Sequence, residues 1–190
     1  MDIASLYASK LTTPERAVAD IPSDSRVSMG MAVAQPPGLL KALADRATAG
    51  AVEDLRLYYF ETTRIAGDTV LRYELNDRLR PYSMFVTAVD RALIKRGMED
   101  GGRKVVSFVP NNFHEAPRLL IEEIGIHTFL HTVSPMDRHG YFSFGTGNDY
   151  STKVARSAKR LIVSSSGPGP REGSSKSGTW FSTIAPTSET

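Results

Sequence analysis

The stretch "SRVSMGMAVAQPPGLLKALADRATAGAVEDLRLYYF", residues 25–60, decides the fold class of this chain. Residues 25–30 are rich in β-forming side chains and end at Gly30. Residues 36–50 then place apolar side chains at helical spacing, with Gly50 as the stop, and 54–60 is a second β-rich run. A strand, a helix and a strand of these lengths predict a βαβ unit, whose two strands lie parallel in one sheet.

The same alternation continues along the chain. We predict further strands at 82–89, 103–109 and 126–133 and a last one beginning at 161. The predicted helices lie at 68–80, 90–102, 114–125 and 148–160, and a short helix opens near Pro14 with Thr12 or Thr13 as its N-cap. The predicted fold is therefore α/β, an open and mostly parallel sheet with helices on both faces.

The last 27 residues depart from this pattern. Residues 164–190 contain 8 Ser, 4 Gly, 4 Thr and 3 Pro and show neither helical nor strand periodicity. We expect a folded domain at 1–163 followed by an irregular Ser/Gly/Pro-rich tail. Two interpretations stay open. The segment is either a disordered tail or the product of a frameshift or truncated gene, because "LIV" (161–163) should begin a buried strand.

Composition excludes several classes of protein. Hydrophobic residues make up 41% and charged residues 23%, and the net charge is +2 with the basic residues dispersed, which argues against a nucleic-acid partner. Without cysteine there is no thiolate metal site and no cysteine nucleophile. The first 21 residues lack a secretory apolar core and no apolar run is long enough to span a membrane, so a cytoplasmic location is expected.

Loops that follow strands of a parallel sheet are where ligands bind. After the first strand, Gly30 permits close backbone approach and a helix begins near Pro36, which suits an anion or simply a tight turn. Asn111 and Asn112 either cap the next helix or bind a carboxylate or thioester oxygen. His114 has no assignable partner and is expected at the surface.

No motif supplies a metal or a nucleophile. His127 and His131 lie on a predicted strand, where they would be about 13 Å apart, so no metal site is expected. Gly145 and Gly147 lack the third glycine of a dinucleotide-binding loop, and no GxSxG, P-loop or HExxH occurs.

Three longer segments nevertheless resemble one known family. They are "KLTTPERAVADIPSDSRVSMGMAVAQPPGLLKALADRA", "VVSFVPNNFHEAPRLL" and "HTVSPMDRHGYFSFGTGNDYSTKVARSAKRLIV". Together they are similar to the N-terminal half of the acetyl-CoA hydrolase/transferase family, and the pattern SPMDxxGYFSxG followed by a DY helix is the most specific marker. The resemblance covers 11–163 and is closest to the branch that acts on short-chain carboxylates such as 4-hydroxybutyrate, butyrate or itaconate.

The resemblance implies a mechanism and a missing part. Family members carry a second α/β domain, and a glutamate of that domain attacks an acyl-CoA thioester to form a glutamyl-CoA thioester. Coenzyme A and a short-chain carboxylate such as acetate are then substrates, and no cofactor stays bound. None of the glutamates here matches that nucleophile, and the family pattern EVNxxMPR does not follow "RLIV". We therefore expect the second catalytic domain to be absent, no catalytic residue in this chain, and an inactive isolated chain.

By the same resemblance this half supplies a wall of the acyl or carboxylate pocket. The implied substrate-binding residues follow three of the strands: Met31, Gln35, Pro36, Asn111, Asn112, Ser134 and Met136. Core packing is the alternative for Met31, Pro36 and Met136. The function is a CoA-transferase, an acyl-CoA hydrolase, or a non-catalytic fragment, with a homo-oligomer or a separately encoded second half as partner.

Overall fold

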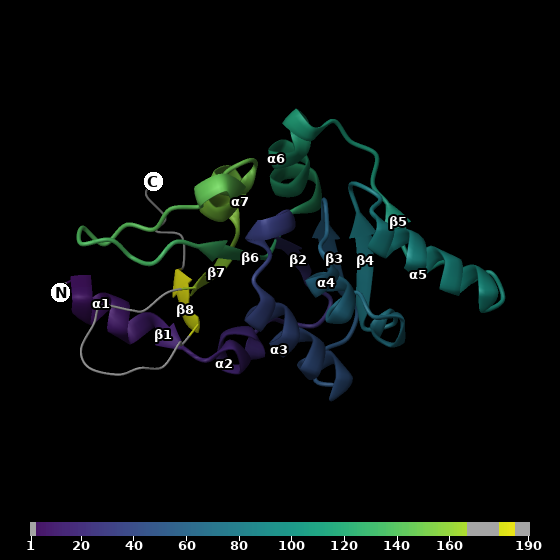
Figure 1. Ribbon diagram of the computed structural model, residues 1–190, viewed down its shortest axis with the longest axis horizontal. Coiled ribbons are helices and arrows are strands. Elements are labelled where there is room, and N and C mark those ends of the chain that lie inside the picture. Colours follow the sequence, from purple (N-terminus) through teal and green to yellow (C-terminus); the bar gives the residue numbers. More distant parts are fainter. Residues whose placement is uncertain (1–2, 167–178, 185–190) are drawn as a thin grey trace.

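The structure, a computed structural model, describes residues 3–166 and 179–184 (Figure 1). One eight-stranded sheet runs in the order β1-β8-β7-β6-β2-β3-β4-β5. The six strands from β7 to β5 are parallel, and β8 pairs antiparallel with β7 and with β1. The strands are β1 Leu11–Thr12, β2 Arg26–Met29, β3 Leu55–Tyr59, β4 Leu79–Ser83, β5 Ser107–Phe108, β6 Thr128–Val133, β7 Arg160–Ser166 and β8 Thr179–Ile184.

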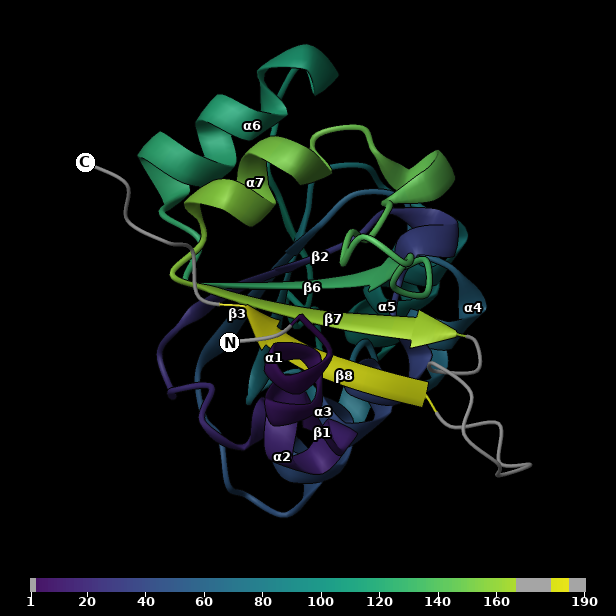
Figure 2. The ribbon, with the colours of Figure 1, turned by 90° about the vertical axis from the view of Figure 1, so that its left-hand side faces the viewer.

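Helices cover both faces, as predicted. Figure 2 shows α6 and α7 on one side of β6 and β7, with α2 and α3 on the other. The α-helices are α1 Ile3–Lys10, α2 Pro14–Ala19, α3 Pro37–Thr48, α4 Arg64–Asp68, α5 Ala88–Glu99, α6 Ala116–Arg118 and α7 Ser151–Ser157. Short turns of 3-10 helix are η1 Ala32–Ala34, η2 Tyr73–Leu75, η3 Phe113–Glu115 and η5 Gly145–Gly147, and η4 Leu119–Ile124 is a π-helix.

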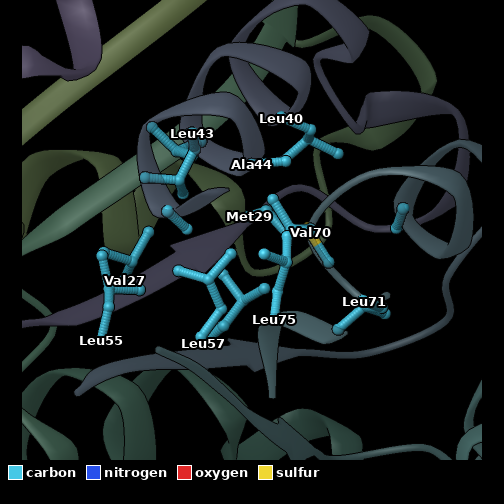
Figure 3. Packing of buried hydrophobic residues seen from close by; sticks show 14 of the residues in the cluster. Val27, Met29, Leu40, Leu43, Ala44, Leu55, Leu57, Val70, Leu71 and Leu75 are labelled. Atoms are coloured by element: carbon cyan, nitrogen blue, oxygen red, sulfur yellow. The ribbon is translucent and has the colours of Figure 1, made fainter. Parts of the chain in front are cut away.

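Alternation along the strands divides the core in two. Val27, Met29, Leu55 and Leu57 point to one face, where they pack against α2, α3, α4 and α5. Figure 3 shows these side chains beneath Leu40, Leu43 and Ala44 of α3 together with Val70, Leu71 and Leu75. On the opposite face a second cluster joins the sheet to α6, η4 and α7; its members include Tyr58, Phe60, Phe129, Leu120, Tyr150 and Val154. Both layers that the βαβ pattern requires are therefore present.

The segment 25–60 folds as its sequence predicts. Strands β2 and β3 pair in parallel, with Arg26 opposite Arg56, and α3 connects them. Gly50 ends the helical segment with φ of +72°, a conformation that glycine adopts without a steric penalty. At α2, Thr13 is the N-cap and accepts a hydrogen bond from Arg16 N (3.3 Å).

The predicted helix at 68–80 is wrong. Helix α4 ends at Asp68, η2 follows, and β4 begins at Leu79, three residues before the predicted strand at 82–89. Pro81 lies inside β4 without loss of a ladder bond, because pairing with β5 begins only at Tyr82 and the bonds to β3 use its neighbours. Pairing with β3 thus outweighed the helical spacing of the apolar residues.

Two other predicted elements are shorter than expected. The strand predicted at 103–109 is confined to Ser107–Phe108, so 103–106 diverges from β4. The helix predicted at 114–125 is a succession of η3, α6 and η4, and it ends at Gly125 with φ of +67°.

The predicted irregular tail is corrected where the structure describes it. Strand β7 continues to Ser166, so Ser164 and Ser165 lie opposite Thr132 and Val133 of β6. Residues 179–184 form β8, which pairs antiparallel with β7 on one side and with the edge strand β1 on the other. The remainder of the tail, 167–178 and 185–190, lies outside the described residues.

Candidate functional site

The sheet has a topological switch point between β2 and β6. From β2 the chain passes through α3 to β3, and from β6 it passes through α7 to β7, on the opposite face and in the opposite direction along the sheet. In open parallel sheets ligands bind in the crevice at the carboxyl ends of two such strands. The candidate site therefore lies between the loop after β2 and the loop after β6.

The loop after β2 is held in a strained and closely packed conformation. Ala32 has φ of +47°, which costs a residue with a side chain on the order of 1–3 kcal/mol. Its N–H donates to the Glu61 carbonyl (2.9 Å) after β3. Gln35, fully enclosed, accepts from Thr63 N (3.1 Å) and Thr63 Oγ1 (2.8 Å). Because Gln35 Oε1 accepts both of these hydrogen bonds, this side chain braces the loop after β2 by tying it to the segment after β3. Met31 is half-buried against the second cluster, and Pro36 is buried at the start of α3.

His131 joins the two loops of the crevice. Its side chain is fully buried, Nδ1 lies 2.5 Å from the Thr132 carbonyl, and Nε2 lies 3.0 Å from Ser151 Oγ of α7. Its ring also packs closely against the backbone of Gly30 and Gly147. A Cβ added to Gly30 would lie 2.8 Å from Cδ2 of the ring, and one added to Gly147 would lie 3.5 Å from Cε1. The strand prediction for this histidine is confirmed, and its contacts are those of a packed imidazole. Among the described residues no group of three or more His, Cys, Asp or Glu is placed to hold a metal ion.

The protonation of His131 should make stability depend on pH. Burial lowers the pKa of this ring below its ordinary value, although the Thr132 carbonyl opposes the effect. Below about pH 6.5 this histidine is therefore protonated in the unfolded chain but still neutral in the folded chain. The free energy of unfolding should then fall by up to ~1.4 kcal/mol for each pH unit by which the pH is lowered. Urea denaturation at pH 7.5 and 5.5 measures this slope. His131→Gln should flatten it, leaving the smaller contribution of His127, whose pKa burial also lowers; an unchanged slope would contradict the assignment.

The SPMD segment forms a tight loop after β6. Asp137 accepts from the backbone N–H groups of His139 (2.8 Å) and Tyr141 (2.9 Å), and these bonds lower the pKa of its carboxyl. Ser134 Oγ accepts from Ser143 N (2.9 Å) and donates to the Pro135 carbonyl (3.0 Å), which closes the base of the loop. Polar residues of this motif thus shape the loop, and Met136, half-buried, lies within it.

The asparagines lie on a different loop. Asn111 Nδ2 donates to the carbonyls of Met84 (3.1 Å) and Val109 (2.9 Å), and Asn112 donates to Glu115 Oε2 (3.0 Å). They follow β5, which β3 and β4 separate from β2. The predicted residues after β2 and β6 therefore follow two adjacent strands at the switch point, whereas Asn111 and Asn112 hold the loop after the edge strand β5.

Sequence reasoning missed an aromatic cluster at the carboxyl ends of the parallel strands. The rings of Phe60, Phe113 and Tyr150 meet at centroid distances of 5.0–6.3 Å, and Tyr150 donates to the Met29 carbonyl (2.9 Å). The cluster brings the loop after β5 back over β3. The available signal was the position of Phe60 at the end of the predicted strand 54–60, with Glu61 directly after it. Several large apolar side chains in these edge loops are exposed: Val33, Phe85, Phe113 and Tyr141.

No helix within the described part of the chain is long and apolar enough to cross a membrane.

Comparison with known proteins gives the family of this fold and site. The model of the acetyl-CoA hydrolase/transferase N-terminal domain matches residues 1–172. A 4-hydroxybutyrate coenzyme A transferase of Clostridium kluyveri is 29% identical over 86% of the chain and 36% of its own length. A succinyl-CoA:cyclohexane-1-carboxylate CoA transferase of Geobacter metallireducens is 28% identical over 87% of the chain and 35% of its own length.

A solved structure matches more closely. RipA from Yersinia pestis is 72% identical, with a TM-score of 0.86, over 87% of this chain and 38% of its own. Solved variants of that protein are named M31G, F60M and E61V, and this chain has Met31, Phe60 and Glu61 at the same numbers. Two further variants replace a glutamate numbered beyond the end of this chain. The chain spans little more than a third of the length of these relatives, and it belongs to the acetyl-CoA hydrolase/transferase family as an N-terminal domain.

Proposed function

We propose that this domain forms one wall of the active site of a carboxylate CoA-transferase. Such an enzyme moves coenzyme A from a short-chain acyl-CoA to a free carboxylate, of the 4-hydroxybutyrate, butyrate, itaconate or acetate type. The observation that carries the proposal is the switch point between β2 and β6, where the braced loop Gly30–Gln35 packs against His131 and Gly147 in a domain of this family. The activities named for the two curated relatives support it.

The wall offers an apolar surface with a polar rim. Met31 and Phe60 belong to the cluster that includes Tyr150, whereas Glu61 is exposed beside them. We infer that the short acyl chain rests against Met31, which packs on the buried cluster that contains Phe60, and that Ser134 and Met136 line the opposite side. Pro36 shapes the loop as the residue before α3, and Gln35 braces it. Asn111 and Asn112 act without touching the substrate, because their hydrogen bonds hold the loop that carries Phe113.

The chemistry would need a glutamate from the part of the relatives that this chain does not match. Its carboxylate attacks the thioester carbonyl, forming an acyl-glutamyl anhydride and releasing CoA thiolate. The thiolate then attacks the glutamyl carbonyl, which gives a glutamyl-CoA thioester and frees the first carboxylate. The acceptor carboxylate reverses the two steps. Coenzyme A is thus a substrate and no resident cofactor is required.

A chimera tests the proposal. Residues 1–163 replace the corresponding part of full-length RipA, whose sequence identity of 72% makes the replacement conservative. The chimera should transfer CoA from acetyl-, butyryl- or 4-hydroxybutyryl-CoA to free acetate or butyrate. Chromatography of the acyl-CoA products measures the transfer for each donor and acceptor pair. Residues 1–190 tested alone should show no turnover, because the glutamate replaced in two RipA variants has a number above 190.

Two controls decide between the outcomes. Replacing the glutamate beyond this chain by alanine in the chimera should abolish transfer without changing its circular dichroism. Release of free CoA that does not depend on an acceptor would instead favour an acyl-CoA hydrolase. The proposal fails if RipA transfers CoA and the folded chimera does not, or if neither transfers CoA on any pair of the panel.

A further inference from the structure

A hollow lies at the amino end of β4, whereas the switch point lies at the carboxyl ends of β2 and β6. It encloses about 300 Å³ between β4 and the segment 103–107, next to the amino end of β4. The hollow exists because only Ser107 and Phe108 of this segment pair with β4, while residues 103–106 diverge. Its lining is mainly polar: Asn76, Asp77, Arg80, Pro81, Tyr82, Arg103, Lys104, Val105 and Ser107.

The charge of the lining is unbalanced. Arg80, Arg103 and Lys104 face one carboxylate within the hollow, Asp77, which pairs with Arg103. Arg80 reaches outside the lining to Asp54, and Lys104 has no ion-pair partner among the described residues. With Asp54 counted against Arg80 and Asp77 against Arg103, Lys104 leaves an excess of one positive charge at the hollow, which favours an anion such as a phosphate group.

Neighbouring strands extend the same positive field. Arg26, Arg56 and Arg80 stand directly opposite one another on β2, β3 and β4. Like charges in register on adjacent strands destabilise a sheet unless an anion lies among them. Asp54, whose φ is +49°, forms ion pairs with two of these three arginines, Arg56 (3.6 Å) and Arg80. The row therefore still carries more positive than negative charge.

The polar groups suit phosphate oxygens. The guanidinium group offers a planar fork of N–H donors that fits phosphate, and an ammonium offers a compact point charge. Arg103 is held in place by Asp77 and lies 5.5 Å from the ring centroid of Tyr73, so its donors are positioned before a ligand arrives. Asn76 Nδ2, by contrast, donates to the Val105 carbonyl (2.7 Å), and this hydrogen bond holds the segment 103–107 beside β4.

We propose that this hollow, the basic pocket, binds the dianion of a phosphate monoester. The pocket is separate from the crevice between β2 and β6, and the inference does not depend on the proposed CoA-transferase activity. Its volume admits a phosphate group with a small organic portion. A free phosphate ion and the 3′-phosphate of coenzyme A present the same chemistry.

Titration of the full chain with inorganic phosphate tests the inference. Isothermal calorimetry at low ionic strength should show saturable binding with Kd of about 1 mM or tighter, and acetate should bind more weakly because it is a monoanion. Lys104→Ser should weaken phosphate binding about tenfold. Asp77→Asn should strengthen it, because the competing carboxylate is removed; a merely structural role of the pocket would not produce these opposite effects.

A matched control and a competition complete the test. Lys153→Ser removes an exposed lysine from α7, far along the sequence, and should leave binding unchanged. Competition by coenzyme A but not by 3′-dephospho-coenzyme A would identify the 3′-phosphate as the source, whereas no competition by either would identify another phosphate. The inference is overturned if phosphate does not bind saturably below about 10 mM, or if Lys104→Ser and Lys153→Ser bind it equally well.

Discussion

Asp90→Ala should lower the free energy of unfolding by about 3–5 kcal/mol, the largest effect that we expect from a single substitution. Asp90 is fully buried and accepts three hydrogen bonds, from Tyr59 OH (2.6 Å), Thr87 N (2.7 Å) and Thr87 Oγ1 (2.7 Å). It closes the capping box that begins α5. Alanine would leave these donors buried without an acceptor, and each such group costs about 1–3 kcal/mol.

Urea denaturation of the full chain, followed by circular dichroism, measures this loss. Asp90→Asn keeps the shape but replaces an acceptor by a donor, so an intermediate loss is expected. Asp68→Ala is the matched control, since Asp68 forms an exposed pair with Arg64 (3.2 Å) and should change stability by less than about 0.5 kcal/mol. Equal losses for Asp90→Ala and Asp68→Ala would show that the buried network does not stabilise this domain.

Gly30→Ala should lower stability by about 3 kcal/mol and disturb the switch-point crevice. A Cβ at this position would stand 2.6 Å from the Ala34 carbonyl oxygen, 2.8 Å from Ala34 Cβ and 2.8 Å from the His131 ring. The first of these atoms is backbone, and Gly30 N is itself bonded to the Leu130 carbonyl (2.9 Å). The loop therefore has to move away from β6, and the position of Met31 moves with it.

Gly67→Ala provides the comparison at another glycine. Its added Cβ would meet only side-chain atoms of Val89, the nearest at 3.2 Å, so the change in stability should stay within about 1 kcal/mol. In the chimera, Gly30→Ala should also reduce the transfer rate, whereas Gly67→Ala should not. If Gly30→Ala is as stable as Gly67→Ala, the close packing of Gly30 against β6 does not constrain the loop.

Local sequence patterns sufficed where an element forms largely from its own residues. The helical spacing at 36–50, the Thr13 cap and the β-rich runs at 25–30 and 54–60 are present in the structure with small shifts at their ends. They failed at 68–80, where pairing of Leu79–Ser83 with β3 takes precedence over helical spacing. They also failed at 179–184, because β8 is defined by its partner β7 and shows no period of its own.

For the candidate site, the sequence selected two loops that the structure places at the switch point, but it did not give their contacts. Gly30, Met31 and Ser134 could be selected because residues after parallel strands gather at one edge. Only the structure shows that Gln35 is committed to Thr63, that His131 lies against Gly30, and that Phe60 belongs to the aromatic cluster. The assignment of substrate-binding roles to the seven predicted residues stays a prediction.

The sequence by itself determined the α/β class, the first βαβ unit and, through the SPMD pattern, the family. These features depend on residues that are neighbours along the chain, so periodicity and motif are enough to reveal them. Only the tertiary structure decided the strand order, and with it the crevice between β2 and β6 and the basic pocket beside β4. Residues about a hundred positions apart, such as Gly30 and His131, come into contact there, and their packing depends on which strands pair.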